Sequence, residues 1–201
     1  MLQSPHPPLI LASQSSARAA LLRGAGLRFE ARAARVDEAA AKAAAQAEGA
    51  SAADAALFLA GLKAARIRDP DALVIGADQI LVCEDTWFDK PATPGEARAH
   101  LQALRGRTHT LETAIVCHRG GQEVWRHVAR PRLAMRPFSN AFLDAYLAAE
   151  GDAVLASVGA YRLEGLGAQL FDRVEGEHAA VLGLPLLPLL GFLRQHGVLL
   201  A

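Results

Sequence analysis

Apolar and polar positions along the chain follow two different periods, and together these predict an α/β protein. Short runs that are apolar, β-branched or alternating are typical of strands. They cover residues 9–12, 73–75, 79–83 and 108–118, with 123–132 expected to pair back as a hairpin. Longer segments rich in alanine and leucine predict helices. They cover residues 17–23, 38–68 (as two helices), 94–104, 140–149 and 186–196.

Turn and cap residues divide these segments. Gly49 breaks the alanine-rich region, and Ser51 with Asp54 has the spacing of a helix start. Gly76-Ala77-Asp78 is expected to end one strand, with the next beginning at Gln79. The glycine-rich segment 159–167 is expected to be a loop. Because strands and helices interleave, the fold class is α/β.

Length and charge narrow the picture further. The chain has 201 residues, of which 52% are apolar, so residues 1–201 are expected to form a single domain. Basic and acidic residues number 21 each, which argues against nucleic acid or an anionic membrane as a partner. Cys83 and Cys117 lie in apolar runs and are expected to be reduced. The N-terminus lacks a signal-like basic segment and the apolar run 181–193 is too short for a membrane span, so a cytoplasmic protein is expected.

The first candidate for chemistry is the strand-to-helix junction that contains Ser13, Ser15 and Arg18. Backbone N–H groups at a helix start, hydroxyls beside them and one arginine suit a phosphate group. An ordinary serine-capped helix with a solvated arginine explains the same residues equally well.

The second candidate is Asp78, which follows an apolar run. A carboxylate beyond a strand end can hold a metal ion or take a proton from water, although from position alone a turn-forming aspartate is the commoner case. Glu38, Lys63 and Lys90 are further charged candidates. Their spacing alone does not unite them, and each could simply be solvated.

The ordered combination of short motifs resembles the Maf family of nucleotide pyrophosphatases over nearly the whole chain. The motifs are LILASQSSARAALL (9–22), VDE (36–38), KA (63–64), IGADQ (75–79), KP (90–91), LRGRTH (104–109), GAYRLEGLG (159–167) and GLPL (183–186). The resemblance implies a mixed sheet flanked by helices, two lobes with a cleft between them, and a homodimer. It also implies hydrolysis of a nucleoside triphosphate to a monophosphate and pyrophosphate with a divalent cation.

Site residues follow from the resemblance position by position. Asp78 matches the family's catalytic acidic position, and Glu38 matches a second carboxylate that is expected, with Asp78, to hold Mg²⁺ or Mn²⁺. Arg18, Lys63 and Lys90 match basic positions around the triphosphate, beside the hydroxyls of Ser13 and Ser15. A triphosphate carries about four negative charges, so a metal ion and several cations suit this reaction. Asp78 is then expected to orient and deprotonate the attacking water.

Residues around the base resemble the branch of the family that acts on 7-methyl-GTP. That branch has a G-[SA]-D-Q motif and an E-G motif, which match Gln79 and Glu164, whereas the dTTP and UTP branch has GADT and I-Q-G. A carboxylate suits guanine, which offers two N–H donors and gains a positive charge on N7 methylation. The chain departs from the branch at Ser16 and Ala17, where proline and tryptophan are usual, so a cation–π contact of about 0.5–2 kcal/mol is missing.

Three alternatives remain open from the sequence. The first is a dTTP and UTP pyrophosphatase, and the second is a nucleotide-binding regulator of septum formation. The third is an α/β domain whose motifs are only caps and turns, which does not explain their joint order.

Overall fold

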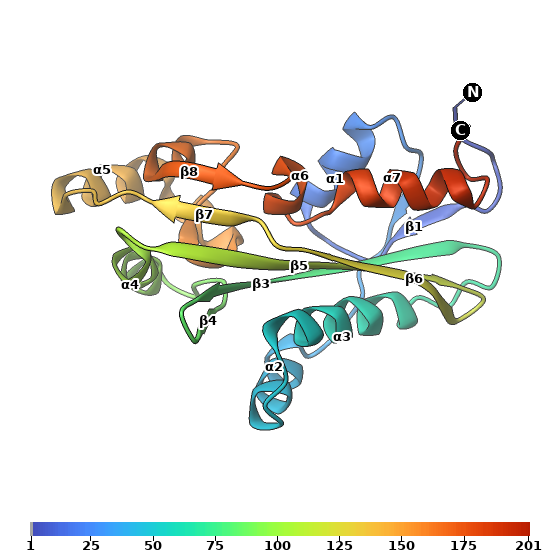
Figure 1. Ribbon diagram of the computed structural model, residues 1–201, viewed down its shortest axis with the longest axis horizontal. Coiled ribbons are helices and arrows are strands. Elements are labelled where there is room, and N and C mark those ends of the chain that lie inside the picture. Colours follow the sequence, from blue (N-terminus) through green and yellow to red (C-terminus); the bar gives the residue numbers. More distant parts are fainter. Residues whose placement is uncertain (1) are drawn as a thin grey trace. The chain divides into compact units, whose positions relative to one another are not determined.

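The computed structural model describes residues 2–201, which form eight strands of one mixed sheet and seven α-helices (Figure 1). The predicted class, a mixed sheet flanked by helices, is confirmed. The strands are β1 (Leu9–Leu11), β2 (Glu30–Ala31), β3 (Leu73–Cys83), β4 (Thr86–Phe88), β5 (Thr108–Arg119), β6 (Gln122–Ala129), β7 (Arg132–Met135) and β8 (Phe171–Glu175). The α-helices are α1 (Ser16–Gly24), α2 (Glu38–Ala47), α3 (Ala52–Ala65), α4 (Pro94–Leu104), α5 (Asn140–Glu150), α6 (His178–Val181) and α7 (Leu186–Gln195). Short 3₁₀ helices cover Gly151–Ala156, Val158–Ala160 and Leu166–Leu170.

Strands neighbour one another in the order β2-β1-β3-β5-β7-β8, with β4 paired to β3 and β6 paired to β5. β1 is parallel to β2 and β3, whereas β4, β6, β7 and β8 form antiparallel pairs. None of the helices in residues 2–201 combines the length and the apolar character that a membrane span requires. Both cysteines are buried free thiols, as predicted.

The chain forms two compact units, which are described separately. Unit 1 contains residues up to Asp78, Thr113–Ala129 and Glu177–Ala201, and unit 2 contains Gln79–Glu112 and Arg130–Gly176. Strands β3 and β5 contribute to both units, so the chain first passes from one to the other between Asp78 and Gln79. The cleft between two lobes and the single-domain assignment stay predictions.

In unit 1 the strands are buried on both faces. Leu11 of β1 and Ile75 of β3 pack in a cluster with residues of α1 and α7. Ile10 and Val74, one position out of phase, pack instead with Ala64 of α3. Because successive side chains on a strand point to opposite faces, α1 and α7 cover one face of these strands and α3 covers the other, as Figure 1 shows.

Unit 2 is built on the antiparallel pairs β5–β7 and β7–β8, with helices α4 and α5 in contact. His109 on β5 is 1% exposed, and its Nε2 lies 2.8 Å from the hydroxyl of Tyr161. The Tyr161 ring meets Phe171 edge to face, with centroids 4.8 Å apart. Burial lowers the pKa of His109 to about 4, so this aromatic cluster contains a neutral imidazole at pH 7.

Two predicted boundaries are wrong. Residues 73–75 and 79–83 form the single strand β3, because the glycine between them serves close helix packing, not a turn. Asp78 therefore lies within a strand and not beyond its end. The predicted hairpin strand 123–132 stops at Ala129, and Arg132 begins the separate strand β7.

Candidate active site

Asp78 and Lys63 form a buried ion pair in unit 1. Asp78, on β3, is 3% exposed, and Lys63, in the last turn of α3, is 6% exposed. Lys63 Nζ donates to Asp78 Oδ1 at 2.6 Å. The other carboxylate oxygen, Oδ2, is buried and accepts no hydrogen bond within residues 2–201. Since buried polar atoms in folded proteins are nearly always paired, this oxygen marks a position where a ligand can bind.

Glu38, on α2, forms an ion pair with the same Lys63 ammonium group. Its Oε1 lies 2.8 Å from Lys63 Nζ, and its side chain is 48% exposed. Glu38 is the first residue of α2, whose cap is Asp37, and a negative charge is favourable in the first turn of a helix. Lys63 thus brings together the two carboxylates that the sequence predicts to act as a pair.

Gly76 explains why α3 can hold Lys63 over Asp78. A Cβ added at Gly76 would lie 2.0 Å from the carbonyl oxygen of Ala60 and 2.9 Å from the backbone nitrogen of Ala64. Both distances are far inside van der Waals contact, so helix and strand meet backbone to backbone at this point. The close approach is two residues before Asp78 on the strand, and on the helix it flanks Lys63.

The junction between β1 and α1 forms the second part of the site. Ser15 is the N-cap of α1, and its hydroxyl accepts from the backbone N–H of Arg18 at 3.3 Å. The hydroxyl of Ser13 accepts from the backbone N–H of Ser15 at 3.2 Å and from Arg18 Nη1 at 3.4 Å. Ser15 therefore caps the helix and Ser13 holds the turn before it, so both hydroxyls lie near the N-terminus of α1, where an anion is favoured.

Arg18 is anchored to the backbone beside the catalytic candidate. Its Nη1 donates to the carbonyl of Ala77 at 3.0 Å, and its Nε donates to the carbonyl of Gly183 at 2.7 Å. Burial lowers the pKa of Arg18, while the negative charges of Asp78 and Glu38 oppose that shift. An arginine remains charged in any such environment, so Arg18 is a fixed cation within range of both carboxylates.

Gly183 and Gly76 are residues whose importance sequence reasoning missed. Gly183 has φ +97°, and a Cβ there would lie 3.2 Å from Arg18 Nε. This glycine opens the GLPL motif, but the sequence offers no sign that it faces Arg18. For Gly76 a signal exists, because Ala60 and Ala64 repeat at i, i+4 and so put a smooth stripe on α3.

Of the remaining predicted residues, Ala17 lies on α1 in unit 1 and is partly buried, whereas Gln79, Lys90 and Glu164 lie in unit 2. Gln79 follows Asp78 on β3 and is partly buried, and Lys90 is exposed just after β4. The side chain of Glu164 is 39% exposed, and its Oε1 lies 3.5 Å from Arg162 Nε. The shared site that these residues would complete with unit 1 stays a prediction.

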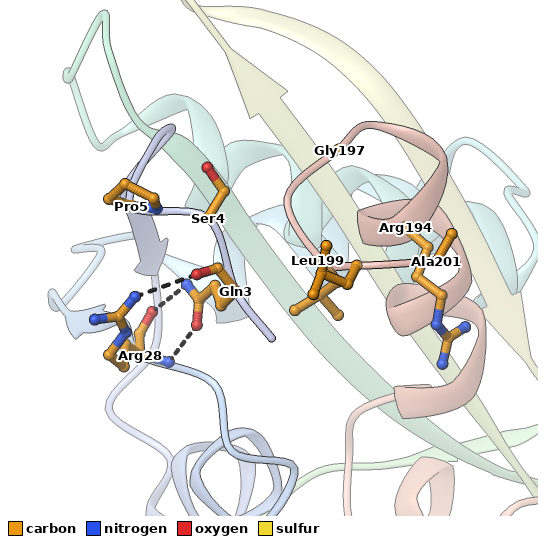
Figure 2. Close-up of a pocket in the computed structure, with 9 residues that line it drawn as sticks. Gln3, Ser4, Pro5, Arg28, Arg194, Gly197, Leu199 and Ala201 are labelled. Atoms are coloured by element: carbon orange, nitrogen blue, oxygen red, sulfur yellow. Dashed lines mark hydrogen bonds between the residues drawn. The ribbon is translucent and has the colours of Figure 1, made fainter. Parts of the chain in front are cut away.

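A separate hollow of about 630 Å³ lies in unit 1 at the two ends of the chain, and none of the predicted site residues lines it (Figure 2). Gln3 and Arg28 face each other there. The Gln3 amide donates to the carbonyl of Arg28 at 2.9 Å and accepts from its N–H at 2.7 Å. These bonds, with the bridge between Gln3 and Leu199, tie the N-terminal segment down.

Comparison with known proteins agrees with the motif order. The model of the family described as Maf-like protein matches residues 8–196. A nucleoside triphosphate pyrophosphatase of Granulibacter bethesdensis is 58% identical over 95% of this chain and 98% of its own length. One of Rhodospirillum rubrum is 55% identical over 97% and 98% of the two chains. A 7-methyl-GTP pyrophosphatase of Rhizobium meliloti is 50% identical over 96% and 98%.

Proposed function

Because the chain belongs to the Maf-like protein family, we propose that it hydrolyses a nucleoside triphosphate to the monophosphate and pyrophosphate. The observation that carries the proposal is the arrangement at Lys63, which pairs with Asp78 and Glu38 at 2.6 and 2.8 Å while Asp78 Oδ2 has no hydrogen-bond partner among residues 2–201. A carboxylate oriented on one oxygen and vacant on the other is suited to accept a proton from water.

Charge balance supports an anionic substrate with an accompanying cation. In unit 1 the cations Arg18 and Lys63 are balanced by Asp78 and Glu38, so two positive and two negative charges leave a net charge of zero. A triphosphate adds about four negative charges, which this set alone does not compensate. Further positive charge is required, and Lys90 is the family-matched residue that would add one unit.

A divalent cation, Mg²⁺ or Mn²⁺, is the proposed source of the rest. Residues 2–201 contain no group of three or more histidine, cysteine or acidic side chains that could hold a metal ion. Two carboxylates are nevertheless sufficient for Mg²⁺, which is commonly held by one or two of them together with substrate phosphates and water. Glu38 and Asp78 would supply those two carboxylates. When bound, the ion would offset phosphate charge as a Lewis acid.

The chain's own residues have distinct roles in this proposal. Asp78 Oδ2 accepts the proton of the attacking water, and Lys63 holds the carboxylate through Oδ1. Ser13 and Ser15 bind phosphate oxygens at the start of α1, where backbone N–H groups also point. Arg18 donates to phosphate oxygens through the guanidinium N–H groups that are not bonded to the Ala77 and Gly183 carbonyls.

We propose 7-methyl-GTP, or a related modified nucleotide, as the substrate. Gln79 and Glu164 match that branch, and one relative at 50% identity carries that name. A broader or different specificity, including dTTP and UTP, is the alternative. Two observations favour it: the more similar relatives bear the general name, and Ala17 provides no ring to stack on the base.

A nucleotide panel tests these proposals together. 7-Methyl-GTP, GTP, dTTP and UTP are each incubated with Mg²⁺ or Mn²⁺, and pyrophosphate and orthophosphate are measured separately. We expect pyrophosphate as the first product and the highest kcat/KM for 7-methyl-GTP. Orthophosphate as the first product would reject the proposed bond cleavage. Tight nucleotide binding without turnover would favour the regulator of septum formation.

The metal role has its own test. Chelation should abolish turnover, and Glu38→Gln should raise the Mn²⁺ concentration needed for half-maximal activity. Binding of Mn²⁺ to the protein with a nucleoside monophosphate, followed by electron paramagnetic resonance, should weaken in the same variant. Unchanged Mn²⁺ binding would remove Glu38 from the metal site.

We also propose an oligomeric state and a cellular location. A homodimer follows from the family resemblance, and light scattering at several protein concentrations tests it. A cytoplasmic location accords with two buried cysteines that remain free thiols, because disulfides are rare in that compartment.

A further inference from the structure

Glu150 is a buried carboxylate that the reaction described above does not use. It is the last residue of α5, and its side chain is only 6% exposed. A negative charge is unfavourable at the C-terminal end of a helix, and burial adds a desolvation cost. An acid in this position therefore needs specific partners.

The partners of Glu150 all belong to the segment that carries Glu164. Glu150 Oε1 accepts from the backbone N–H of Leu166 at 3.1 Å, and its Oε2 lies 3.5 Å from Arg162 Nη1. Gly165 permits this approach, since a Cβ there would lie 3.2 Å from Glu150 Oε1. One carboxylate thus holds both sides of the turn around Glu164.

Arg162 is shared between two acids. Its Nη1 faces Glu150 and its Nε lies 3.5 Å from Glu164 Oε1. Gly167 fixes the backbone of Arg162, because a Cβ at Gly167 would lie 2.4 Å from the Arg162 carbonyl oxygen. The Arg162 backbone is therefore held in place, and its guanidinium lies between a buried carboxylate and a half-exposed one.

The charge of this triad has a consequence for ligand binding. Two acids and one arginine leave a net charge of −1, and Glu164, 39% exposed against 6% for Glu150, is the acid that a ligand can reach. Without Glu150, the single positive charge of Arg162 would be free to neutralise Glu164 fully. The triad as built therefore favours a ligand group that is cationic or rich in N–H donors.

We propose that Glu150 is a specificity-determining positioning residue: by engaging Arg162, it limits how far this arginine offsets the negative charge that Glu164 presents to the base. This inference rests on the proposed function, in which Glu164 recognises the base of the nucleotide. Glu150 acts on Glu164 through Arg162, while its bond to the Leu166 N–H holds the turn in place.

Removing the charges one at a time tests the proposal. In Glu150→Gln, the ratio of kcat/KM for 7-methyl-GTP to that for GTP should fall about fivefold, the size of one half-exposed ion pair. In the double variant Glu150→Gln/Arg162→Gln, the net charge returns to −1, and the ratio should recover toward that of the parent. A merely structural role predicts the opposite, because removing a second partner would lower the ratio further. A double variant as poor as Glu150→Gln overturns the proposal.

A binding measurement and a control complete the design. Affinities for 7-methyl-GMP and GMP, measured by calorimetry, should follow the same pattern without turnover. Glu175→Gln removes another arginine-paired acid of unit 2, 3.0 Å from Arg173, and should leave the ratio unchanged. If the parent releases pyrophosphate from nucleotides without preferring the methylated base, this inference fails while the proposed hydrolysis to monophosphate and pyrophosphate stands. If the parent releases no pyrophosphate, the proposed function fails first.

Discussion

The predicted phosphate and base residues lie in regions that are built differently. Lys63, Asp78 and Arg18 are on or anchored to regular elements of unit 1, with contacts of 2.6–3.0 Å and two of the three side chains less than 10% exposed. Arg162 and Glu164 lie in a turn of unit 2, with contacts of 3.5 Å and side chains 39% exposed. Short buried contacts hold one geometry, whereas long exposed contacts are easily rearranged. The phosphate residues are therefore suited to a fixed reaction, and the turn to adjustable selection.

The largest effect is expected from breaking the rigid region at Asp78. Asp78→Asn keeps the shape but removes the proton acceptor, so kcat should fall by about 10²–10⁴-fold. Thermal unfolding should remain cooperative, because Lys63 retains Glu38 as a partner. The exposed Asp71→Asn is a matched control on the same chain segment and should be fully active. Wild-type turnover in Asp78→Asn would remove this residue from the mechanism.

This contrast also explains how far the sequence alone reaches. Helix starts such as Ser51 and Thr93 are predicted correctly, because a cap is a local contact within four residues. The continuity of β3 through Gly76 is missed, because this glycine is required for close packing against α3, and that contact cannot be seen in the local sequence. Strand β8 is missed because its five residues include charged, exposed positions and depend on pairing with β7.

In the candidate site, too, the sequence predicts some features and misses those that depend on distant contacts. Asp78, Lys63 and Glu38 are found through the order of motifs, and the structure brings these three together. Their short distances cannot be read from spacing, since Lys63 lies 25 residues after Glu38 and 15 residues before Asp78, and no local period relates these separations. Glu150 has no sequence signal, because its partners are contributed by a turn whose conformation no pattern predicts.

The second prediction concerns the buried anchor beneath the adjustable turn, the bond between His109 and Tyr161. The pKa of His109 is lowered from 6.5 to about 4, so the unfolded chain binds a proton in this range and the folded chain does not. The stability associated with neutral His109 is complete above pH 6.5 and is lost as the pH falls toward 4, by up to about 3 kcal/mol.

Chemical unfolding at several pH values measures this effect. His109→Gln should flatten the pH dependence of the unfolding free energy between pH 6.5 and 4. The exposed His6→Gln should leave it unchanged. An equally steep curve in His109→Gln would mean that other groups cause the acid loss.

The third prediction tests the backbone approach that makes the phosphate region rigid. Gly76→Ala introduces a Cβ 2.0 Å from the Ala60 carbonyl, so α3 must shift away from β3. Overpacking of this kind costs about 1–3 kcal/mol of unfolding free energy, and kcat should fall because Lys63 moves with the helix. Gly61→Ala on the same helix meets no atom within 4 Å and should instead stabilise the protein by about 0.5–1 kcal/mol.

The smallest effect is expected from restoring an aromatic ring for the base. Ala17→Trp adds a ring at the start of α1, beside the anchored Arg18, where the 7-methyl-GTP branch usually has tryptophan. A cation–π contact with a methylated, positively charged base should strengthen binding of 7-methyl-GMP by about 0.5–2 kcal/mol, with a smaller gain for GMP.

Calorimetry with both monophosphates separates a specific contact from a general apolar one. Ala20→Trp places the same ring on an exposed position of α1 and should change neither affinity. An equal gain for both nucleotides in Ala17→Trp would show stacking that does not sense the methyl charge. In that case discrimination would rest on the Glu164 turn alone, and the Ala17→Trp/Glu150→Gln variant should be as unselective as Glu150→Gln.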